Sequence, residues 1–444
     1  MSPAAPARAR WTVVALLCAM SFMSYFDRTI MGIAGSKAIQ AEFRLEDAEL
    51  GTILTAFSLV YAIFMIPGGR FVDRLGPRRA LAYVSLGSGL FTALTAMGGW
   101  PALGTLFGAP LAFLLVRGLL GAFTAPLYPG CARANALWVP FEGRNLVQGL
   151  IAAGAGLSSA VAPVVFNRMI DRWGWRFSFV YAGLATLALG LLWVWLFRDR
   201  PAENHSIRTR SDPPLVPPEE PLAVHASPSA PWGKLLTSPH LLLLTTSYFA
   251  TSYVMYIFFY WTFHYLKELR GLSDGQSALA TLAVNGGWIV LSPLGGWASD
   301  RFTRRYGPRT GMRVVPVASL ILSAVCLVLG VQCASLWLAV ALLALSFGFA
   351  GSADGPYWAA AIRLGGRDVA AACAIMNTGG NLGGIGNWST AKIADRFGWD
   401  WGLYSAAAVM VAGALLWLFI DVTRAAGGSD PRLDVWKTEP KIVP

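Results

Sequence analysis

The chain has 444 residues, of which 55% are apolar and only 13% are charged, and its mean hydropathy is +0.52. Soluble domains carry about 25% charged residues, so this composition excludes a soluble globular enzyme and a disordered protein. The net charge of +11 alone would suit a nucleic-acid-binding module. Lys and Arg, however, stand in short clusters between long apolar runs. That placement excludes nucleic acid as a partner and is typical of a polytopic membrane protein in a lipid bilayer.

Apolar runs long enough to cross a bilayer recur along the chain, since a spanning helix needs about 20 residues. They begin near Trp11, Gly51, Ala80, Phe107, Val147 and Phe177, and then near His240, Ser277, Val314, Ser335, Ala370 and Trp401. The sequence therefore predicts an all-α membrane protein with about twelve transmembrane helices, six on each side of an interruption.

Most Lys and Arg residues fall in the connections on one side of these runs, together with both ends of the chain. By the positive-inside rule, both termini are expected in the cytoplasm, with the protein in the inner (plasma) membrane. The five cysteines lie mostly within apolar runs and follow no metal-ligand spacing, so we interpret them as small buried hydrophobic residues and expect neither a metal nor a cofactor.

The interruption, residues 198–234, is rich in Pro, Ser and charge and lacks an apolar period. It predicts a flexible cytoplasmic linker between an N-terminal bundle (1–197) and a C-terminal bundle (235–424), with a cytoplasmic tail at 425–444. GGRFVDRLGPRR after the second run returns as GGWASDRFTRRYGPR after the eighth. The same unusual string in the same place of each half indicates duplication.

The first of these strings, Gly68–Arg79, resembles the signature between helices two and three of the major facilitator superfamily. Further strings resemble its anion:cation symporter branch: SYFDR (24–28), YAIFMIPGGR (61–70), RGLLGAFTAPLYPG (117–130), YWTFHYLKELRGLS (260–273) and MNTGGNLGGIGN (376–387). That branch carries hexuronates, aldonates, glucarate and related organic anions with protons. The resemblance implies two six-helix bundles that rock about a central cavity, a complete pathway in one chain and hence a monomer.

The resemblance also implies that the repeated basic loops act as cytoplasmic latches, through Asp73 with Arg74 and Asp300 with Arg301. An Asp at a helix end can pair with an Arg or with a helix N-terminus, and both contacts break during rocking. The alternative is a solvated cluster of loop charges.

Ionisable residues inside spans are costly and are therefore functional candidates. Arg28 is the first, because a guanidinium holds a carboxylate bidentately, and the resemblance implies that it binds the substrate carboxylate. Tyr25, three residues earlier on the same helical face, is expected to bind the same anion. A permanent ion pair of Arg28 with another helix is the alternative.

Asp27 is the candidate proton carrier. Burial and a nearby guanidinium act in opposite senses on the proton affinity of a carboxyl group, and alternating access changes both. Adjacent helical residues do not face each other, so Asp27 is expected to pair with a different helix, with Arg117 as the candidate partner. A structural salt bridge is the alternative interpretation.

Helix four departs from the family pattern, in which an Arg is followed seven residues later by a Glu and then by Ala-Pro. Here Arg117 is followed at that spacing by Thr124, Ala125 and Pro126. Threonine cannot titrate, so one protonatable site of the family is missing, and Arg117 becomes a candidate for binding substrate.

Asp354 in the tenth run is a candidate replacement, either as a relocated proton site or as a ligand for a substrate hydroxyl or amine. The alternative is an Asp solvated at a helix end. Trp358, four residues later, matches a family aromatic residue beside the substrate, and Tyr61 in the second run offers a second aromatic wall.

Asn377 and Asn381 stand one helical turn apart in the eleventh run, and the matching family positions face the cavity. Amides both donate and accept hydrogen bonds, which suits the hydroxyls of a sugar acid. The alternative is hydrogen bonding between helices.

The sequence thus predicts a secondary transporter that imports a small organic anion, a sugar acid or related carboxylate, by proton symport. The alternative keeps the fold but makes the protein a facilitator, exchanger or exporter without proton coupling, which Thr124 favours. An enzyme is not expected, because no nucleophile–base pair, metal cluster or phosphate loop stands out.

Overall fold

The computed structural model of the protein describes residues 7–98, 108–199 and 232–424, and within these ranges the chain is helical, without strands. The helices of the first half are α1 (Ala7–Ala34), η1 (Gly35–Ile39), α2 (Gln40–Phe43), α3 (Asp47–Leu75), α4 (Pro77–Thr95), α6 (Ala109–Thr124), α7 (Leu127–Trp138), η2 (Phe141–Gly143) and α8 (Arg144–Leu196). Those of the second half are α9 (Trp232–Leu236), α10 (Pro239–His264), η4 (Tyr265–Leu269), α11 (Asp274–Gln332), α12 (Leu336–Ser352), α13 (Asp354–Gly365), α14 (Val369–Leu382), α15 (Ile385–Phe397) and α16 (Trp399–Trp417).

Eight helical stretches of the described residues are long and apolar enough to cross a membrane. Two of them, α8 with 53 residues and α11 with 59, bend at Gly174 and Gly307, where a positive φ breaks the helix into two spans. Helix α4 and the pair α14–α15 supply the remaining crossings. The predicted twelve-helix fold is confirmed, although the predicted start of one span, Phe107, lies outside the described residues.

The chain divides into two compact units. Unit 1 comprises residues 1–139 and 150–219, and unit 2 comprises residues 140–149 and 220–444. Residues 140–149, which precede the predicted linker, group with the second half. Most of the predicted linker (200–231) and the predicted tail (425–444) lie outside the described residues.

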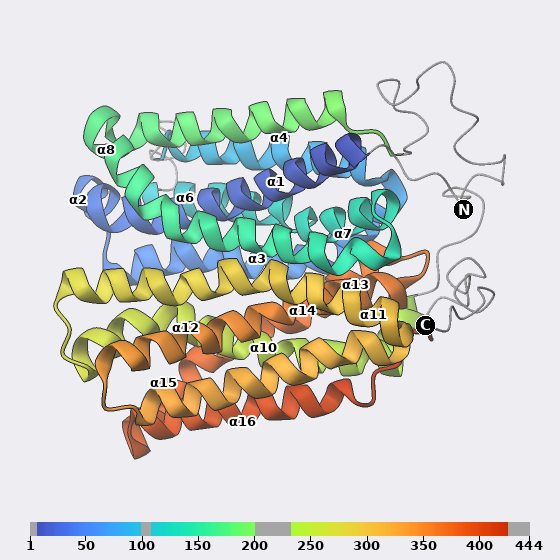
Figure 1. Ribbon diagram of the computed structural model, residues 1–444. Helices are drawn as coiled ribbons and strands as arrows, with labels where there is room; N and C mark the ends of the chain where they lie inside the picture. Colours follow the sequence, from blue (N-terminus) through green and yellow to red (C-terminus); the bar gives the residue numbers. More distant parts are fainter. Residues whose placement is uncertain (1–6, 99–107, 200–231, 425–444) are drawn as a thin grey trace. The chain divides into compact units, whose positions relative to one another are not determined.

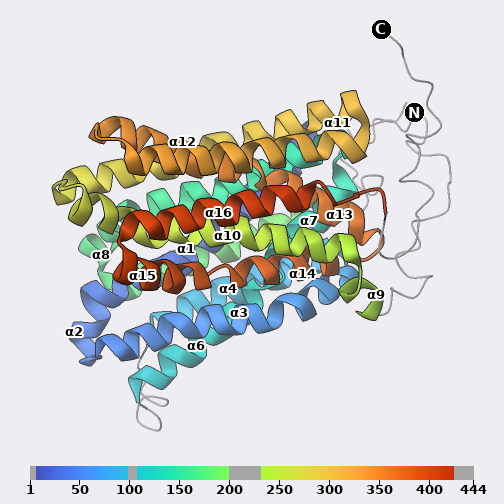
Figure 2. The same cartoon turned by 90° about the horizontal axis from the view of Figure 1, so that it is seen from below.

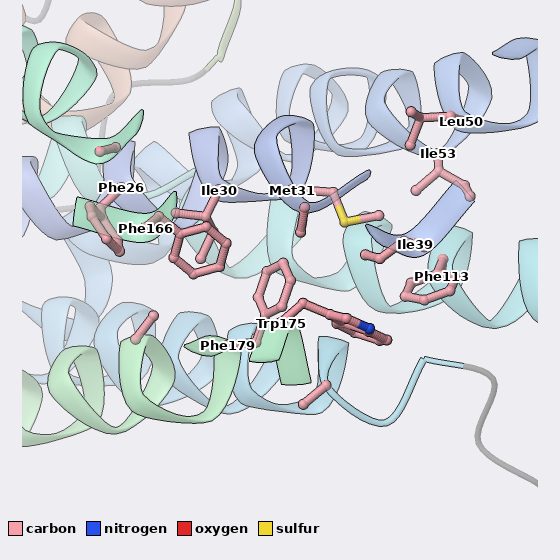
Figure 3. Close-up of a cluster of buried hydrophobic side chains, with 14 of the residues drawn as sticks. Phe26, Ile30, Met31, Ile39, Leu50, Ile53, Phe113, Phe166, Trp175 and Phe179 are labelled. Atoms are coloured by element: carbon pink, nitrogen blue, oxygen red, sulfur yellow. The ribbon is translucent and has the colours of Figure 1, made fainter. Parts of the chain in front are cut away.

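In unit 1, α6 packs against both α3 and α4 (Figure 1). Its core contains buried aromatic rings in edge-to-face contact, with centroids 6.0 Å apart for Phe26 and Phe166 and 5.3 Å apart for Phe166 and Phe179. Figure 3 shows these rings together with Ile30 and Trp175. Such pairs stabilise a core beyond the apolar area that they bury, so this cluster fixes α1 against α8.

In unit 2, α10 packs against both α14 and α16, and α11 packs against α12 and α16. Figure 2 shows α16 running beside α10, and α15 also packs against α16. Helix α10 therefore lies in contact with the elements that carry the predicted polar residues of this unit.

The two units repeat the same irregularities, as the duplicated string predicts. A π-helical turn follows the first long helix of each unit, as η1 after α1 and as η4 after α10. The repeated string turns at Gly76 (φ 79°) in unit 1 and at Gly307 (φ 76°) in unit 2. Both turns need a residue that tolerates the left-handed region, which explains the glycine in each copy.

Candidate functional site

Two guanidinium groups meet the same aromatic ring in unit 1. The Cζ atom of Arg28 lies 5.3 Å and that of Arg117 lies 5.4 Å from the centroid of Phe57. Arg28 also lies 5.9 Å from the ring of Tyr25, one turn earlier on α1 as the spacing predicts. The two cations repel each other, so an anion at this place would relieve the repulsion.

Arg117 is tied to the backbone of α1. Its Nη1 donates to the carbonyl of Asp27 and its Nη2 donates to the carbonyl of Arg28, both at 3.1 Å. The side chain is only 1% exposed, and its Nε has no hydrogen-bond partner. Arg117 therefore holds α1 at the position of the two candidate residues.

The carboxylate of Asp27 is buried and accepts a hydrogen bond of 2.8 Å from the hydroxyl of Thr186 on α8. Asp27 and Arg117 attract each other, but the hydrogen bonds of Arg117 go to backbone carbonyls rather than to this carboxylate. The expectation of a partner on another helix thus leads to Thr186. Sequence reasoning missed Thr186, because a single Thr in an apolar run carries no signal.

Aromatic side chains surround the cationic pair. Tyr61 stacks on Phe57 with ring centroids 5.8 Å apart, and Tyr25 meets the ring of Tyr128 at 6.4 Å. The hydroxyl of Tyr128 lies 3.0 Å from that of Ser21. Tyr25 and Tyr61 thus join one group, to which the structure adds Phe57 and Tyr128.

Thr124 stands at the end of α6, where the fourth span is interrupted before α7. Its hydroxyl donates to the carbonyl of Leu120 at 2.7 Å and lies 3.0 Å from the hydroxyl of Ser88. Both hydrogen bonds are buried, so this position is neutral and satisfied.

In unit 2 the tenth span is interrupted at the corresponding place, between α12 and α13, and Asp354 is the first residue of α13. The Asp354 side chain is 5% exposed and accepts a hydrogen bond of 3.0 Å from the hydroxyl of Tyr248. The alternative of a solvated Asp at a helix end is therefore wrong. Trp358 meets the ring of Tyr248 edge-on, with 6.3 Å between centroids, and its side chain also interacts with Asp354.

The two asparagines of α14 are tied to each other and to α10. The Nδ2 of Asn381 donates to the carbonyl of Asn377 at 2.8 Å, and its Oδ1 accepts from the hydroxyl of Tyr256 at 3.1 Å. The alternative, hydrogen bonding between helices, is therefore present between α10 and α14. A role in binding substrate stays a prediction. The structure adds two tyrosines of α10 to the predicted polar residues of unit 2, Tyr248 beside Asp354 and Tyr256 beside Asn381.

Among the predicted latch residues, Asp300 binds the start of α8. Its Oδ1 accepts from the side-chain amide of Asn145 at 2.7 Å, and its Oδ2 accepts from the backbone N–H of Leu146 at 2.9 Å. The carboxylate thus caps the N-terminus of α8, an arrangement that the helix dipole favours.

The acid of the first latch lies near an arginine of another helix. Asp73 is 3.9 Å from the Nε of Arg133, whereas Arg74 and Arg301 are exposed. Arg304, on the same helix as Arg301, donates a hydrogen bond to the carbonyl of Glu142 at 3.2 Å.

The chain is similar to known proteins in sequence and in fold. The model of the Major Facilitator Superfamily matches residues 17–386 and 289–440. The probable sulfoacetate transporter SauU of Cupriavidus necator is 28% identical over 420 residues, which cover 93% of this chain and 94% of that protein. The hexuronate transporter of Bacillus subtilis is 27% identical over 423 residues, 93% of each chain. The Escherichia coli fucose:proton symporter FucP shares the fold, with a TM-score of 0.66 at 18% identity over 93% of this chain and 99% of that one. The chain therefore belongs to the Major Facilitator Superfamily.

Proposed function

We propose that this protein is a secondary transporter that imports a small organic anion, a sugar acid or a related carboxylate or sulfonate. The observation that carries the proposal is the pair of guanidinium groups against Phe57, 5.3 and 5.4 Å from its centroid. Relatives named for sulfoacetate, hexuronate and galactonate transport support the same class of cargo.

Each member of the pair has its own part in binding. Arg117 is a positioning residue, because its terminal nitrogens hold two backbone carbonyls of α1. Arg28, half-buried between Tyr25 and Phe57, presents the cation that binds the carboxylate. Tyr61 closes the group as an aromatic wall.

In unit 2, uncharged polar side chains are the candidates for binding the substrate hydroxyls. Tyr248, Trp358 and Asn381 offer hydroxyl, indole and amide groups, which suit the hydroxyls of a sugar acid. Asn377 offers a second side-chain amide to the same hydroxyls, while its backbone carbonyl accepts the amide hydrogen bond of Asn381.

Protons drive the import, with Asp27 and Asp354 as the carriers. Each carboxylate is buried and accepts a hydrogen bond from a neutral hydroxyl, that of Thr186 for Asp27 and that of Tyr248 for Asp354. A buried carboxylate exchanges its proton when alternating access changes its hydration. Asp354 replaces the acid that is missing at Thr124. It lies where the tenth span is interrupted, which corresponds to the interruption after Thr124 in unit 1.

Alternating access would open and close the hydrogen bonds of Asp300 to the start of α8 and the pairing of Asp73 with Arg133. The second candidate function, an organic anion facilitator, exchanger or exporter without proton coupling, is favoured by the satisfied, neutral Thr124.

Purified protein in liposomes tests the proposal. A thermal-shift screen of sugar acids, sulfoacetate and the matching neutral sugars identifies the cargo, because binding raises the melting temperature by mass action. We expect anions alone to stabilise the protein and Arg28→Ala to abolish the shift, while Arg79→Gln, an exposed arginine of the first repeated loop, retains it. Stabilisation by neutral sugars alone would overturn the organic anion class. An uptake rate that is the same with and without an inward proton gradient would favour the second function, transport without proton coupling.

A further inference from the structure

The two copies of the repeated string differ by one helical turn. Asp73 stands three residues before Gly76, whereas Asp300 stands seven residues before Gly307. The helix in unit 2 continues without a break up to Gly307. Four additional residues extend it by about 6 Å, one turn, beyond its counterpart.

One exposed face of α11 runs into this additional turn. Its residues recur every three or four positions and so share one side of the helix. They are Val290 (57% exposed), Leu294 (51%), Trp297 (52%), Arg301 and Arg305. We call these five residues the α11 stripe. Its order, two aliphatic side chains, one Trp and two Arg, follows that of a bilayer from hydrocarbon through interface to headgroups.

The two arginines of the stripe have no acidic partner among the described residues. The carboxylate of Asp300 is occupied by Asn145 and Leu146. Arg305 lies 5.6 Å from the ring centroid of Tyr306, a contact that orients the guanidinium without neutralising it. Two positive charges therefore remain beside an apolar surface.

Unit 1 has only part of this arrangement, because its exposed face on α3, with Phe64 (48% exposed), Phe71 (37%) and Arg74, has neither the Trp nor the second Arg. The counterpart of Trp297 in the first copy is Arg70, which is only 6% exposed. The turn after Gly76 is capped by an acid, because the backbone N–H of Arg78 donates to Asp199 at 2.9 Å. No such group lies within 4 Å of the Cβ position of Gly307.

We propose that the α11 stripe binds an anionic phospholipid. The phosphate lies against Arg301 and Arg305, Trp297 lies at the level of the glycerol, and an acyl chain packs along Leu294 and Val290. A lipid fits better than a soluble anion, because the charged end continues directly into an exposed apolar face. The site is independent of the transported substrate.

Native mass spectrometry of the full chain with equal amounts of phosphatidylglycerol and phosphatidylcholine of identical acyl chains tests this site. The wild type should retain phosphatidylglycerol preferentially. One surface cation contributes about fivefold to the affinity for an anionic membrane, so Arg301→Gln/Arg305→Gln should lose on the order of 20-fold in that preference. The control Arg79→Gln/Lys234→Gln removes the same charge from exposed positions elsewhere and should retain it.

Trp297→Ser tests the apolar part of the site. This variant should weaken the retention of both lipids and leave their ratio unchanged. If the control Arg79→Gln/Lys234→Gln lost the preference for phosphatidylglycerol to the same extent, the effect would come from net charge alone, and the proposal would be overturned. Displacement of the lipid by millimolar inorganic phosphate would also overturn it, because the site would then be one for a soluble anion.

Discussion

The buried carboxylate of Asp27 accepts a 2.8 Å hydrogen bond from the hydroxyl of Thr186, which joins α1 to the second half of α8. The other carboxylate oxygen, Oδ1, has no hydrogen-bond partner. A buried oxygen without a partner is costly for the charged form of the group. This arrangement supports the proposed role of Asp27 as a proton carrier.

Asp27→Asn should abolish uptake driven by a proton gradient while retaining counterflow exchange, because exchange moves substrate without net proton movement. Both rates can be measured in the same liposomes with radiolabelled substrate. Thr186→Val is the matched control, because it removes the hydroxyl but keeps the titratable group, and it should retain driven uptake at a reduced rate. Driven uptake at the wild-type level in Asp27→Asn would exclude Asp27 as a carrier.

Replacement of the two clustered arginines by lysine should separate positioning from binding. The planar fork of Arg117 reaches two carbonyls at once, which a lysine ammonium cannot reproduce. Arg117→Lys should therefore lower the stability of the folded protein by about 2–4 kcal/mol. Arg28→Lys should leave the melting temperature close to that of the wild type and weaken substrate binding. Fluorescence-detected melting of both variants checks this, and equal melting temperatures would contradict the role of Arg117.

The sequence predicts the helices and the duplication well, because length, apolar content and the repeated Gly-Pro-Arg turn are local properties. It also singles out Asp27, Arg28 and Arg117, since charge within a span is rare. It does not reveal Phe57 or Thr186, because an apolar or hydroxyl side chain in a long apolar run is equally compatible with facing lipid, core or site. Only the rotation of each helix in its bundle decides which of these faces it adopts.

Outside the spans, Glu42 of α2 is bound by Arg176 and by the indole of Trp175, whose nitrogen donates to it at 2.8 Å. The hydrogen bonds from Arg176 lower the pKa of Glu42. A lowered pKa means that the folded state binds fewer protons than the unfolded chain. This contribution to stability is therefore complete above the usual Glu pKa of about 4.3 and is lost as the pH falls through the lower, folded value.

Melting of wild type and Glu42→Gln should accordingly differ at neutral pH and converge in acid, below about pH 4. Because the ion pair is partly exposed, the difference should stay below about 1 kcal/mol. Arg176→Gln should show the same convergence. A difference that persists in acid would mean that Glu42 acts through packing rather than through its charge.

Close contact between α4 and the second half of α8 in unit 1 depends on two facing glycines. A Cβ atom added at Gly183 would lie 2.4 Å from the carbonyl oxygen of Gly89 and 2.6 Å from the nitrogen of Ala93, both of which are backbone atoms that cannot move aside singly. Gly183→Ala should therefore destabilise the protein by about 1–3 kcal/mol. Gly32→Ala on α1 is the control, because nothing lies within 4 Å of its Cβ position and alanine favours the helix by roughly 1 kcal/mol. Melting temperatures in detergent should fall for the first variant and hold or rise for the second, and the reverse order would contradict this packing of α4 on α8.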